Sequence, residues 1–393
     1  MREVVILGTA RTAGGQFGGS FQGLTAPELG AEVVKEAIKR SGITPDVIDQ
    51  TVFGNAWQAG VGPNAARICS VKGGIPVEAP AVTVNVRCGS SIQALIFGAQ
   101  AIKAGDVDTV MVGGAESASQ IPYGLPRARW GYRMGNGELI DFMHKDGFLC
   151  PLGGGLMGEM TDWLAKEKGI SRREQDIFAA ESHNKAEAAV REGWFRDEVV
   201  PIPVKKKGET LMVTEEEIYR KGVTPESLEK LKPVFSKDGT VTAGNACALC
   251  DAASAAVLME RGKAEAMGLK PAALLRGYAF VGVEPKRFGI SPAKAIPVAL
   301  KKAGLTLGDI DLIELNEAFA AQYIACEQDL GLDRSKVNPY GGAIALGHPV
   351  AATGTKILAT LLSAMRQRDV TLGAVSLCIG GGNGVAAIVE RLS

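Results

Sequence analysis

Residues 37–56, AIKRSGITPDVIDQTVFGNA, have a counterpart near the end of the chain in residues 299–318, ALKKAGLTLGDIDLIELNEA. The two segments align without gaps at a separation of 262 residues, and seven of twenty positions are identical. The identical pairs are Ala37/Ala299, Lys39/Lys301, Gly42/Gly304, Thr44/Thr306, Ile48/Ile310, Asp49/Asp311 and Ala56/Ala318. Each copy predicts a helix that stops at glycine, a short turn and an apolar strand. We therefore expect two duplicated halves, with chance similarity of two helix–turn–strand units as the alternative.

The segments around the first copy alternate between short apolar strands and amphipathic helices. We expect a helix at Ala26–Ser41 and strands at Glu3–Leu7, Gln50–Phe53 and Thr109–Gly113. Residues 108–114 and 373–381 are both apolar strands that end in glycines, one in each half. This alternation predicts an α/β fold with a buried sheet.

Residues 121–249 interrupt the pattern with prolines, glycines and a charged stretch, and they predict an inserted loop domain. A helix at Ser171–Glu192 is expected inside it, because Ser171 and Glu174 have capping-box spacing. The expected organisation is a first half from residues 1–120 plus about 250–270, the insertion at 121–249, and a second half at 271–393.

Composition excludes several classes of protein. The 43 basic residues balance 43 acidic ones, whereas a nucleic-acid binder normally shows a basic excess. No apolar run approaches the ~20 residues of a membrane span, and the start of the chain reads as a buried strand rather than a signal peptide. Seven cysteines, an odd number, fit reduced thiols better than a disulfide framework, so we expect a cytoplasmic protein.

Cys88 lies between a predicted strand at 82–85 and an apolar helix at 92–102. At a helix N-terminus the free N–H groups and the dipole should depress the pKa of the thiol, and nearby N–H groups could bind an oxyanion. The alternative is a buried structural thiol.

The chain has only three histidines, so each can be considered individually. His348 lies in a loop rich in glycine and proline before an apolar helix at 351–365, where it could act as a base, or it could be structural. His183 lies among charged and polar residues, which favours a solvated surface position. His144 lies in the insertion, where a functional role is the less favoured interpretation.

Three further motifs carry polar groups or thiols. Cys378 ends a predicted strand before three glycines, which would let a ligand approach closely. Asn316 follows the strand at 313–315 and could face a crevice at the carboxyl end of the sheet, or cap the next helix. Cys247 and Cys250 form a Cys-x-x-Cys, but zinc would need two more ligands and none is nearby, so no metal site is expected.

Together these motifs resemble the thiolase family over essentially the whole chain. The resemblance is carried by residues 2–20, by 85–93 around Cys88, and by four short blocks. These blocks are TAGN at 242–245, NEAFA at 316–320, NPYGGAIALGHPVAATG at 338–354 and SLCIGGGNG at 376–384. The family fold implies two similar α/β halves in a five-layer αβαβα arrangement, with a loop domain inserted into the first.

The resemblance also implies an acyl-CoA acetyltransferase with a two-step exchange. Cys88 would take the acyl group, His348 would activate Cys88, and Asn316 would hold a water for an oxyanion hole. Cys378 would handle the α-carbon proton, and the backbone N–H groups of Cys88 and Gly380 would form a second oxyanion hole. Acetyl-CoA and 3-ketoacyl-CoA are the implied substrates, coenzyme A is a substrate or product, and no permanent cofactor is implied.

Contacts with coenzyme A are implied at eight further positions, of which Arg220 would meet the nucleotide. The others, near the pantetheine, are Ser227, Ala243, Ala246, Cys247, Met157, Ala318 and Phe319. A solvated charged face is the alternative for Arg220. The chain departs from the common family pattern at Ser91, Leu156, Cys247, Cys250, Phe288 and Asn383, which leaves the acyl pocket and the preferred chain length open.

Several functions compete with biosynthesis of acetoacetyl-CoA. A degradative thiolase with a longer or unusual acyl preference would use the same residues, and the direction in fatty acid metabolism does not follow from the sequence. A ketoacyl synthase would need a second histidine beside the cysteine. A non-catalytic lipid or CoA carrier would not need two thiols and a loop histidine.

Assembly is predicted from residues 127–133, RARWGYR, whose arginines and aromatics in a glycine-rich loop are typical of interfaces. With the resemblance, this segment predicts a homotetramer, or failing that a dimer.

Overall fold

The computed structural model describes residues 2–206 and 208–392, and it contains the predicted repeat. Helix α1 (Ala26–Ser41) ends at Gly42, and helix α8 (Ser291–Ala303) ends at Gly304, with φ of 69° and 71°. Glycine adopts this left-handed conformation without the steric cost that a Cβ would bring. Strands β3 (Gln50–Gly54) and β14 (Leu312–Leu315) follow the two helices.

The shared aspartates of the repeat perform the same task in both halves. The Asp49 carboxylate accepts hydrogen bonds from the backbone N–H groups of Asp108 and Thr109, at 2.9 and 2.8 Å. The Asp311 carboxylate accepts from Thr371 and Leu372, at 3.0 and 2.8 Å. Each aspartate thus fixes the start of the parallel strand next to its own. The halves are therefore duplicated in contacts as well as in sequence.

The two halves contain eight further strands and six further α-helices within the described residues. The strands are β1 (Val4–Arg11), β2 (Gly15–Gln16), β4 (Ala81–Val84), β5 (Thr109–Ser117), β12 (Cys250–Glu260), β13 (Ala273–Gly282), β15 (Leu372–Ile379) and β16 (Asn383–Arg391). The helices are α2 (Ala65–Lys72), α3 (Ser90–Ala104), α7 (Arg261–Ala266), α9 (Ala320–Leu330), α10 (Ala343–Leu346) and α11 (Thr353–Gln367).

The sheet runs β14-β15-β16-β13-β1-β12-β5-β3-β4, with β2 paired to β12. Strand β3 pairs in parallel with β4 and β5, as β14 does with β15, while the strands that follow pair antiparallel. The two halves meet between β1 and β13, where only Val5 with Leu274 and Ile6 with Ala273 are paired. Each half therefore contributes its own sheet, joined by a short seam.

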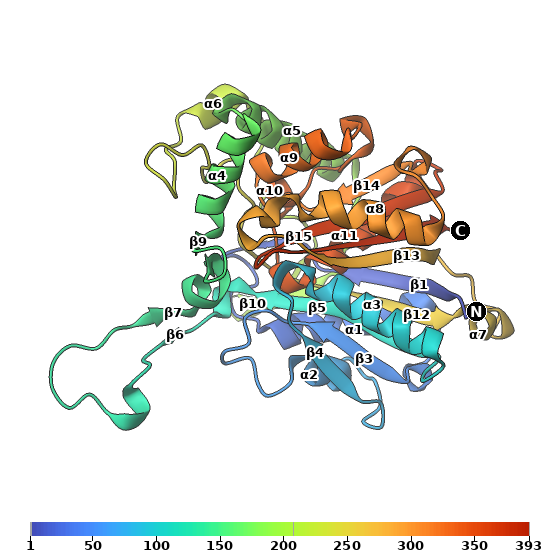
Figure 1. Cartoon of the computed structure of the whole chain (residues 1–393). Helices are drawn as coiled ribbons and strands as arrows, with labels where there is room; N and C mark the ends of the chain where they lie inside the picture. Colours follow the sequence, from blue (N-terminus) through green and yellow to red (C-terminus); the bar gives the residue numbers. More distant parts are fainter. Residues whose placement is uncertain (1, 207, 393) are drawn as a thin grey trace.

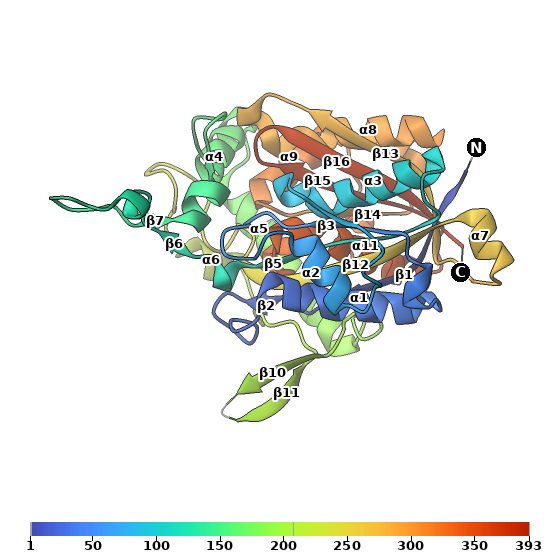
Figure 2. The ribbon, with the colours of Figure 1, turned by 90° about the horizontal axis from the view of Figure 1, so that it is seen from below.

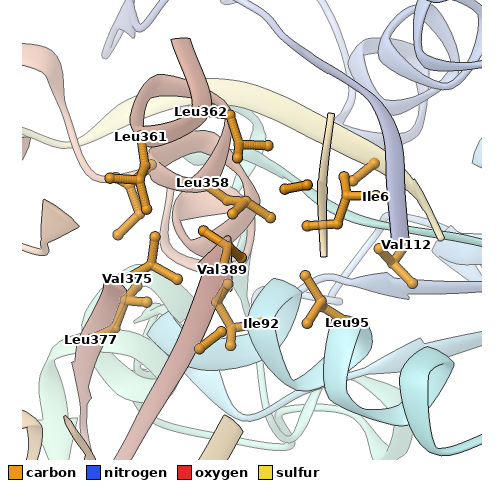
Figure 3. Packing of buried hydrophobic residues seen from close by; sticks show 14 of the residues in the cluster. Ile6, Ile92, Leu95, Val112, Leu358, Leu361, Leu362, Val375, Leu377 and Val389 are labelled. Carbon is orange, nitrogen blue, oxygen red and sulfur yellow. The ribbon is translucent and has the colours of Figure 1, made fainter. Parts of the chain in front are cut away.

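Helices cover the sheets in layers, as Figures 1 and 2 show. Helices α1 and α2 pack on the outer face of the first half, and α8 and α9 pack on the outer face of the second. Helices α3 and α11 lie between the halves, where Ile92 and Leu95 share one core with Leu358 and Leu361 (Figure 3). This is the expected five-layer αβαβα order.

Residues 121–249 leave the sheet after β5 and return to it at β12. They form the helices α4 (Met157–Lys168), α5 (Arg172–Glu192) and α6 (Pro225–Glu229), and the short strands β6 (Tyr123–Gly124), β7 (Ile140–Asp141), β8 (Leu149–Cys150), β9 (Gly155–Leu156), β10 (Ile202–Lys206) and β11 (Glu209–Val213). Strands β6 and β7 begin an arm that extends away from the body (Figure 1). The domain boundaries expected at residues 120, 249 and 270 stay a prediction.

Helix α5 confirms one expectation and overturns another. Ser171 and Glu174 form the predicted capping box, with the Glu174 N–H donating to the Ser171 hydroxyl at 3.2 Å and the Ser171 N–H to the Glu174 carboxylate at 2.7 Å. The surface position predicted for His183 is wrong, because its side chain is buried and its Nδ1 accepts from the Arg220 N–H at 3.2 Å.

No helix within residues 2–206 and 208–392 is long and apolar enough to cross a membrane.

Candidate active site

Cys88 lies in a single 3-10 turn, Arg87–Gly89, directly before α3. Arg87 has a φ of 52°, and its guanidinium donates to the carbonyls of Gly147 and Leu149 at 2.9 and 3.1 Å. The insertion is thereby tied to the turn that carries the thiol. Gly89 lets this turn pack closely on the other half, since a Cβ here would lie 2.2 Å from the Ile379 side chain, which would have to shift.

Cys378 is the penultimate residue of β15, and Gly380 follows that strand. The Gly380 backbone hydrogen-bonds the Cys88 thiol, so the end of the second half's sheet meets the first half's turn. A Cβ on Gly380 would lie 2.8 Å from both the Arg87 guanidinium and the Met157 sulfur. Gly380 is therefore tightly enclosed by these two side chains, and the predicted close approach of a ligand stays a prediction.

His348 lies between the halves, in the loop after α10. Its backbone N–H donates to the Ala248 carbonyl at 2.9 Å, and its Nδ1 hydrogen-bonds the Thr353 hydroxyl at 2.7 Å. Its Nε2 is buried and has no hydrogen-bond partner within the described residues. The ring is therefore fixed at one nitrogen and leaves the other available for proton transfer.

These groups line one cavity of about 90 Å³. Eight of the site residues expected from the sequence line this cavity: Cys88, His348, Cys378, Gly380, Met157, Cys247, Ala318 and Phe319. The other residues that line it are Ala56, Trp57, Arg87, Asp146, Gly147, Phe148, Phe288 and Val350. Thiols and an imidazole are thus set in mainly apolar surroundings.

Burial controls the charges in this cavity. Desolvation raises the pKa of the Cys88 thiol, and the nearby Arg87 charge and the Gly380 N–H only partly oppose it. The predicted depression of the Cys88 pKa is therefore wrong, because loss of water outweighs the Arg87 charge and the backbone N–H groups. Burial also raises the pKa of Cys378 well above its ordinary value. Burial, followed by the Lys356 charge, lowers the pKa of His348 to about 3.

The resting site is consequently a neutral one. The thiols are protonated and the imidazole is neutral at pH 7, because each charged form would lack solvation. A neutral imidazole can accept the proton that a thiol releases during attack on a carbonyl. The arrangement can therefore support nucleophilic acyl transfer.

Asn316 is buried but does not line the cavity. Neither its Oδ1 nor its Nδ2 has a hydrogen-bond partner among residues 2–206 and 208–392. The alternative of a helix cap is wrong, because α9 begins at Ala320 and is capped by Phe319. A buried, unsatisfied amide is unusual and typical of functional positions.

Four predicted coenzyme A contacts lie outside the cavity. Arg220, Ser227 and Ala243 are exposed on the insertion, and Ala246 forms an isolated bridge with Phe319 beside the cavity. The Ser227 hydroxyl donates to the Thr224 carbonyl at 2.6 Å.

Cys247 is half-buried, and burial raises the pKa of its thiol to about 12. No group of three or more metal-ligating side chains occurs within the described chain.

Several residues that hold the site in place were not predicted from the sequence. Arg87 could have been noticed as a charge next to the thiol, and Thr353 as a hydroxyl one turn after His348. Glu116 gave no such signal, yet its buried carboxylate accepts from the N–H groups of Trp57 and Ala351 at 3.2 and 3.1 Å. It thereby connects Trp57, a wall of the cavity, to Ala351, which follows the wall residue Val350. Burial raises the pKa of Glu116 to about 7.

Family models match the chain in two adjoining parts. The model described as Thiolase, N-terminal domain, matches residues 4–262, and the model described as Thiolase, C-terminal domain, matches residues 269–391. Together they cover nearly all of both halves and the insertion.

Curated proteins match over the full length. An acetyl-CoA acetyltransferase of Cupriavidus necator is 47% identical over 392 residues, covering 100% of both chains. The Beta-ketothiolase BktB of the same organism is 47% identical over 394 residues, again covering 100% of both chains. The crystal structure of the Bacillus anthracis acetyl-CoA acetyltransferase superposes with a TM-score of 0.97 at 40% identity, covering 100% of this chain and 99% of that one.

Proposed function

The chain belongs to the thiolase family, and we propose that it is an acetyl-CoA acetyltransferase that carries its acyl group on Cys88. The observation that supports this most directly is the single cavity shared by Cys88, His348, Cys378 and Gly380. It brings a nucleophile, two proton-handling groups and a backbone donor together at the junction of the halves.

The first half-reaction transfers an acyl group to the enzyme. As the Cys88 sulfur attacks the thioester carbonyl of acetyl-CoA, its proton passes to His348 Nε2. The carbon–sulfur bond to coenzyme A then breaks, and the departing thiolate takes the proton from His348. Asn316, through a water, and His348 would stabilise the oxyanion.

The second half-reaction forms the carbon–carbon bond. Cys378 first gives its thiol proton to His348 and then, as a thiolate, removes an α proton from a second acetyl-CoA. The resulting carbanion attacks the acyl carbon on Cys88. The bond from that carbon to Cys88 breaks, the Cys88 sulfur takes the proton from His348, and acetoacetyl-CoA forms. In thiolysis the raised pKa of Cys378 suits it to give a proton to the departing carbanion.

Coenzyme A would lie across the insertion, from Cys247, Met157, Ala318 and Phe319 at the cavity toward Ala246, Ala243, Ser227 and Arg220 outside it. The exposed Arg220 guanidinium suits a phosphate, which it can bind with two parallel hydrogen bonds. The substrates are acetyl-CoA and 3-ketoacyl-CoA, with no permanently bound cofactor. A cytoplasmic location is part of the proposal, since all seven cysteines are free thiols.

A chain-length series tests the proposed function. Thiolysis of 3-ketoacyl-CoAs should be fastest with acetoacetyl-CoA and fall as the acyl chain lengthens, because the cavity is only about 90 Å³. Phe288, a buried wall of this cavity, sets the limit in part. Phe288→Ala should therefore raise the relative rate with longer chains, while Phe280→Ala, an exposed aromatic elsewhere, should not. No thiolysis of any 3-ketoacyl-CoA would contradict the proposal.

Assembly as a homotetramer is proposed from the arm between β6 and β7 (Figure 1). Trp130 and Met134 on this arm are 87% and 94% exposed, which is unusual for large apolar side chains. Replacing both with serine should reduce a tetramer to dimers in light scattering at micromolar protein. Met267→Ser, an exposed apolar residue on the body, serves as the control. A monomeric wild-type protein would contradict both the tetramer and the dimer.

A further inference from the structure

Lys356 lies in the first turn of α11 and is only 4% exposed. Its ammonium group donates to the carbonyl oxygens of Leu346 and Gly347 at 2.6 and 3.0 Å. These carbonyls belong to the two residues directly before His348. The side chain therefore reaches from a central helix to the loop that carries the proposed base.

A buried ammonium group is costly unless other groups solvate it. The two carbonyls supply part of that solvation. A nearby charge cluster is formed by Arg11, Glu198 and Glu216, whose carboxylates favour the charged form of Lys356 while Arg11 disfavours it. Within this cluster Arg11 donates to Glu198 at 2.7 Å and to Glu216 at 2.5 Å. Glu198 and Glu216 come from the insertion and Arg11 from β1, so the cluster connects two parts of the chain beside α11.

The loop before His348 has little freedom of its own. Gly347 has a φ of 80°, and a Cβ there would lie 2.6 Å from the Cys250 sulfur. Beyond it, the His348 N–H and Nδ1 are held by Ala248 and Thr353. The two carbonyls bound by Lys356 complete the set of contacts that fix this backbone.

We propose that Lys356 is a positioning residue that holds the Leu346 and Gly347 carbonyls so that His348 presents Nε2 to the cavity. The inference rests on the proposed function, because it assigns His348 the role of proton acceptor. A displacement of a reacting group by about 1 Å can cost about 100-fold in rate, so the contact has catalytic consequences.

The charge on Lys356 gives this role a measurable signature. It disfavours a second positive charge on His348, and it supports burial in lowering the pKa of that ring to about 3. The charged or titratable groups around Lys356 are Glu216, Cys250, Arg11 and Glu198, and burial lowers its own pKa. Loss of the cation should therefore raise the pKa of His348 and protonate the ring at higher pH.

The test compares Lys356→Gln, which keeps a donor but loses the charge, with Lys356→Arg, which keeps both. The readout is the single-turnover rate of Cys88 acetylation by acetyl-CoA, measured from pH 5 to pH 9. We expect Lys356→Gln to slow acetylation about 10- to 100-fold, with a greater loss at pH 5 than at pH 8, because burial still keeps the pKa of His348 below its ordinary value. Lys356→Arg should recover most of the rate and the wild-type pH profile.

Thr360→Val is the matched control, because Thr360 lies one turn along α11 and donates to Glu198 at 3.0 Å without touching the His348 loop. It should lower thermal stability but leave the pH profile unchanged. The proposal is overturned if Lys356→Gln matches the wild type, or if Thr360→Val changes the profile equally. If Lys356→Gln does not fold, a profile for Lys356→Arg that is shifted to higher pH overturns it as well.

His348→Asn separates this inference from the function beneath it. If His348→Asn acetylates Cys88 at the wild-type rate, the proposed role of His348 fails. If His348→Asn is inactive while Lys356→Gln is unaffected, only the positioning role of Lys356 fails.

Discussion

Cys88→Ser should leave no detectable acetyl-enzyme after brief incubation with labelled acetyl-CoA, whereas the wild-type chain should carry the label on Cys88 alone. A serine hydroxyl is a far weaker acid than a thiol, and a neutral imidazole in an apolar cavity cannot ionise it well enough for attack. Peptide mapping of the quenched protein locates the label.

Cys247→Ser is the control for this experiment. Cys247 lines the same cavity, so its loss tests whether a neighbouring thiol can accept the acyl group. The Cys247→Ser protein should still be labelled on Cys88. Label that persists in Cys88→Ser would show that another residue is the nucleophile.

Cys378→Ser should lower condensation and thiolysis by about 100- to 10,000-fold while acetyl-enzyme still forms. The reason is the division between the two sides of the cavity. Cys88 precedes α3 in the first half, and Cys378 lies near the end of β15 in the second, so one thiol can meet the acyl carbonyl while the other meets the α carbon. Label incorporation and acetoacetyl-CoA turnover should be measured on the same preparation.

Two results would contradict this division of labour. One is near-wild-type thiolysis by Cys378→Ser, which would assign the α-carbon proton to another base such as His348. The other is a loss of acetylation as complete as that of Cys88→Ser. Cys326→Ser, a buried thiol outside the cavity, controls for the effect of removing a core thiol.

The duplicated halves could be predicted from the sequence because the signals are local. Gly42 and Gly304 end helices through their own backbone conformation, and Asp49 and Asp311 stand at fixed distances from them along the chain. Such signals act over a few residues, so they survive in the sequence and can be compared. The blocks around Cys88, His348 and Cys378 could likewise be recognised as short motifs, and the resemblance to the thiolase family implied the roles of these three residues.

The electrostatics of the site were decided only by the tertiary structure. The sequence predicted a depressed pKa for Cys88 and a solvated His183, and both predictions were wrong. Each was based on chain neighbours, whereas desolvation depends on what packs against a group from distant segments. The walls around Cys88 come from β15, the insertion and the His348 loop, which are remote from it in the chain.

The candidate reactive groups could be identified from the amino-acid sequence: two thiols, a loop histidine and an amide, on two copies of one α/β unit. The shared cavity of Cys88, His348 and Cys378, and the contact of Lys356 with the His348 loop, emerge only when the chain is folded. This difference arises because capping and periodicity are properties of adjacent residues. Burial, by contrast, is set when α3 and α11 pack between the two halves and exclude water from the groups at their ends.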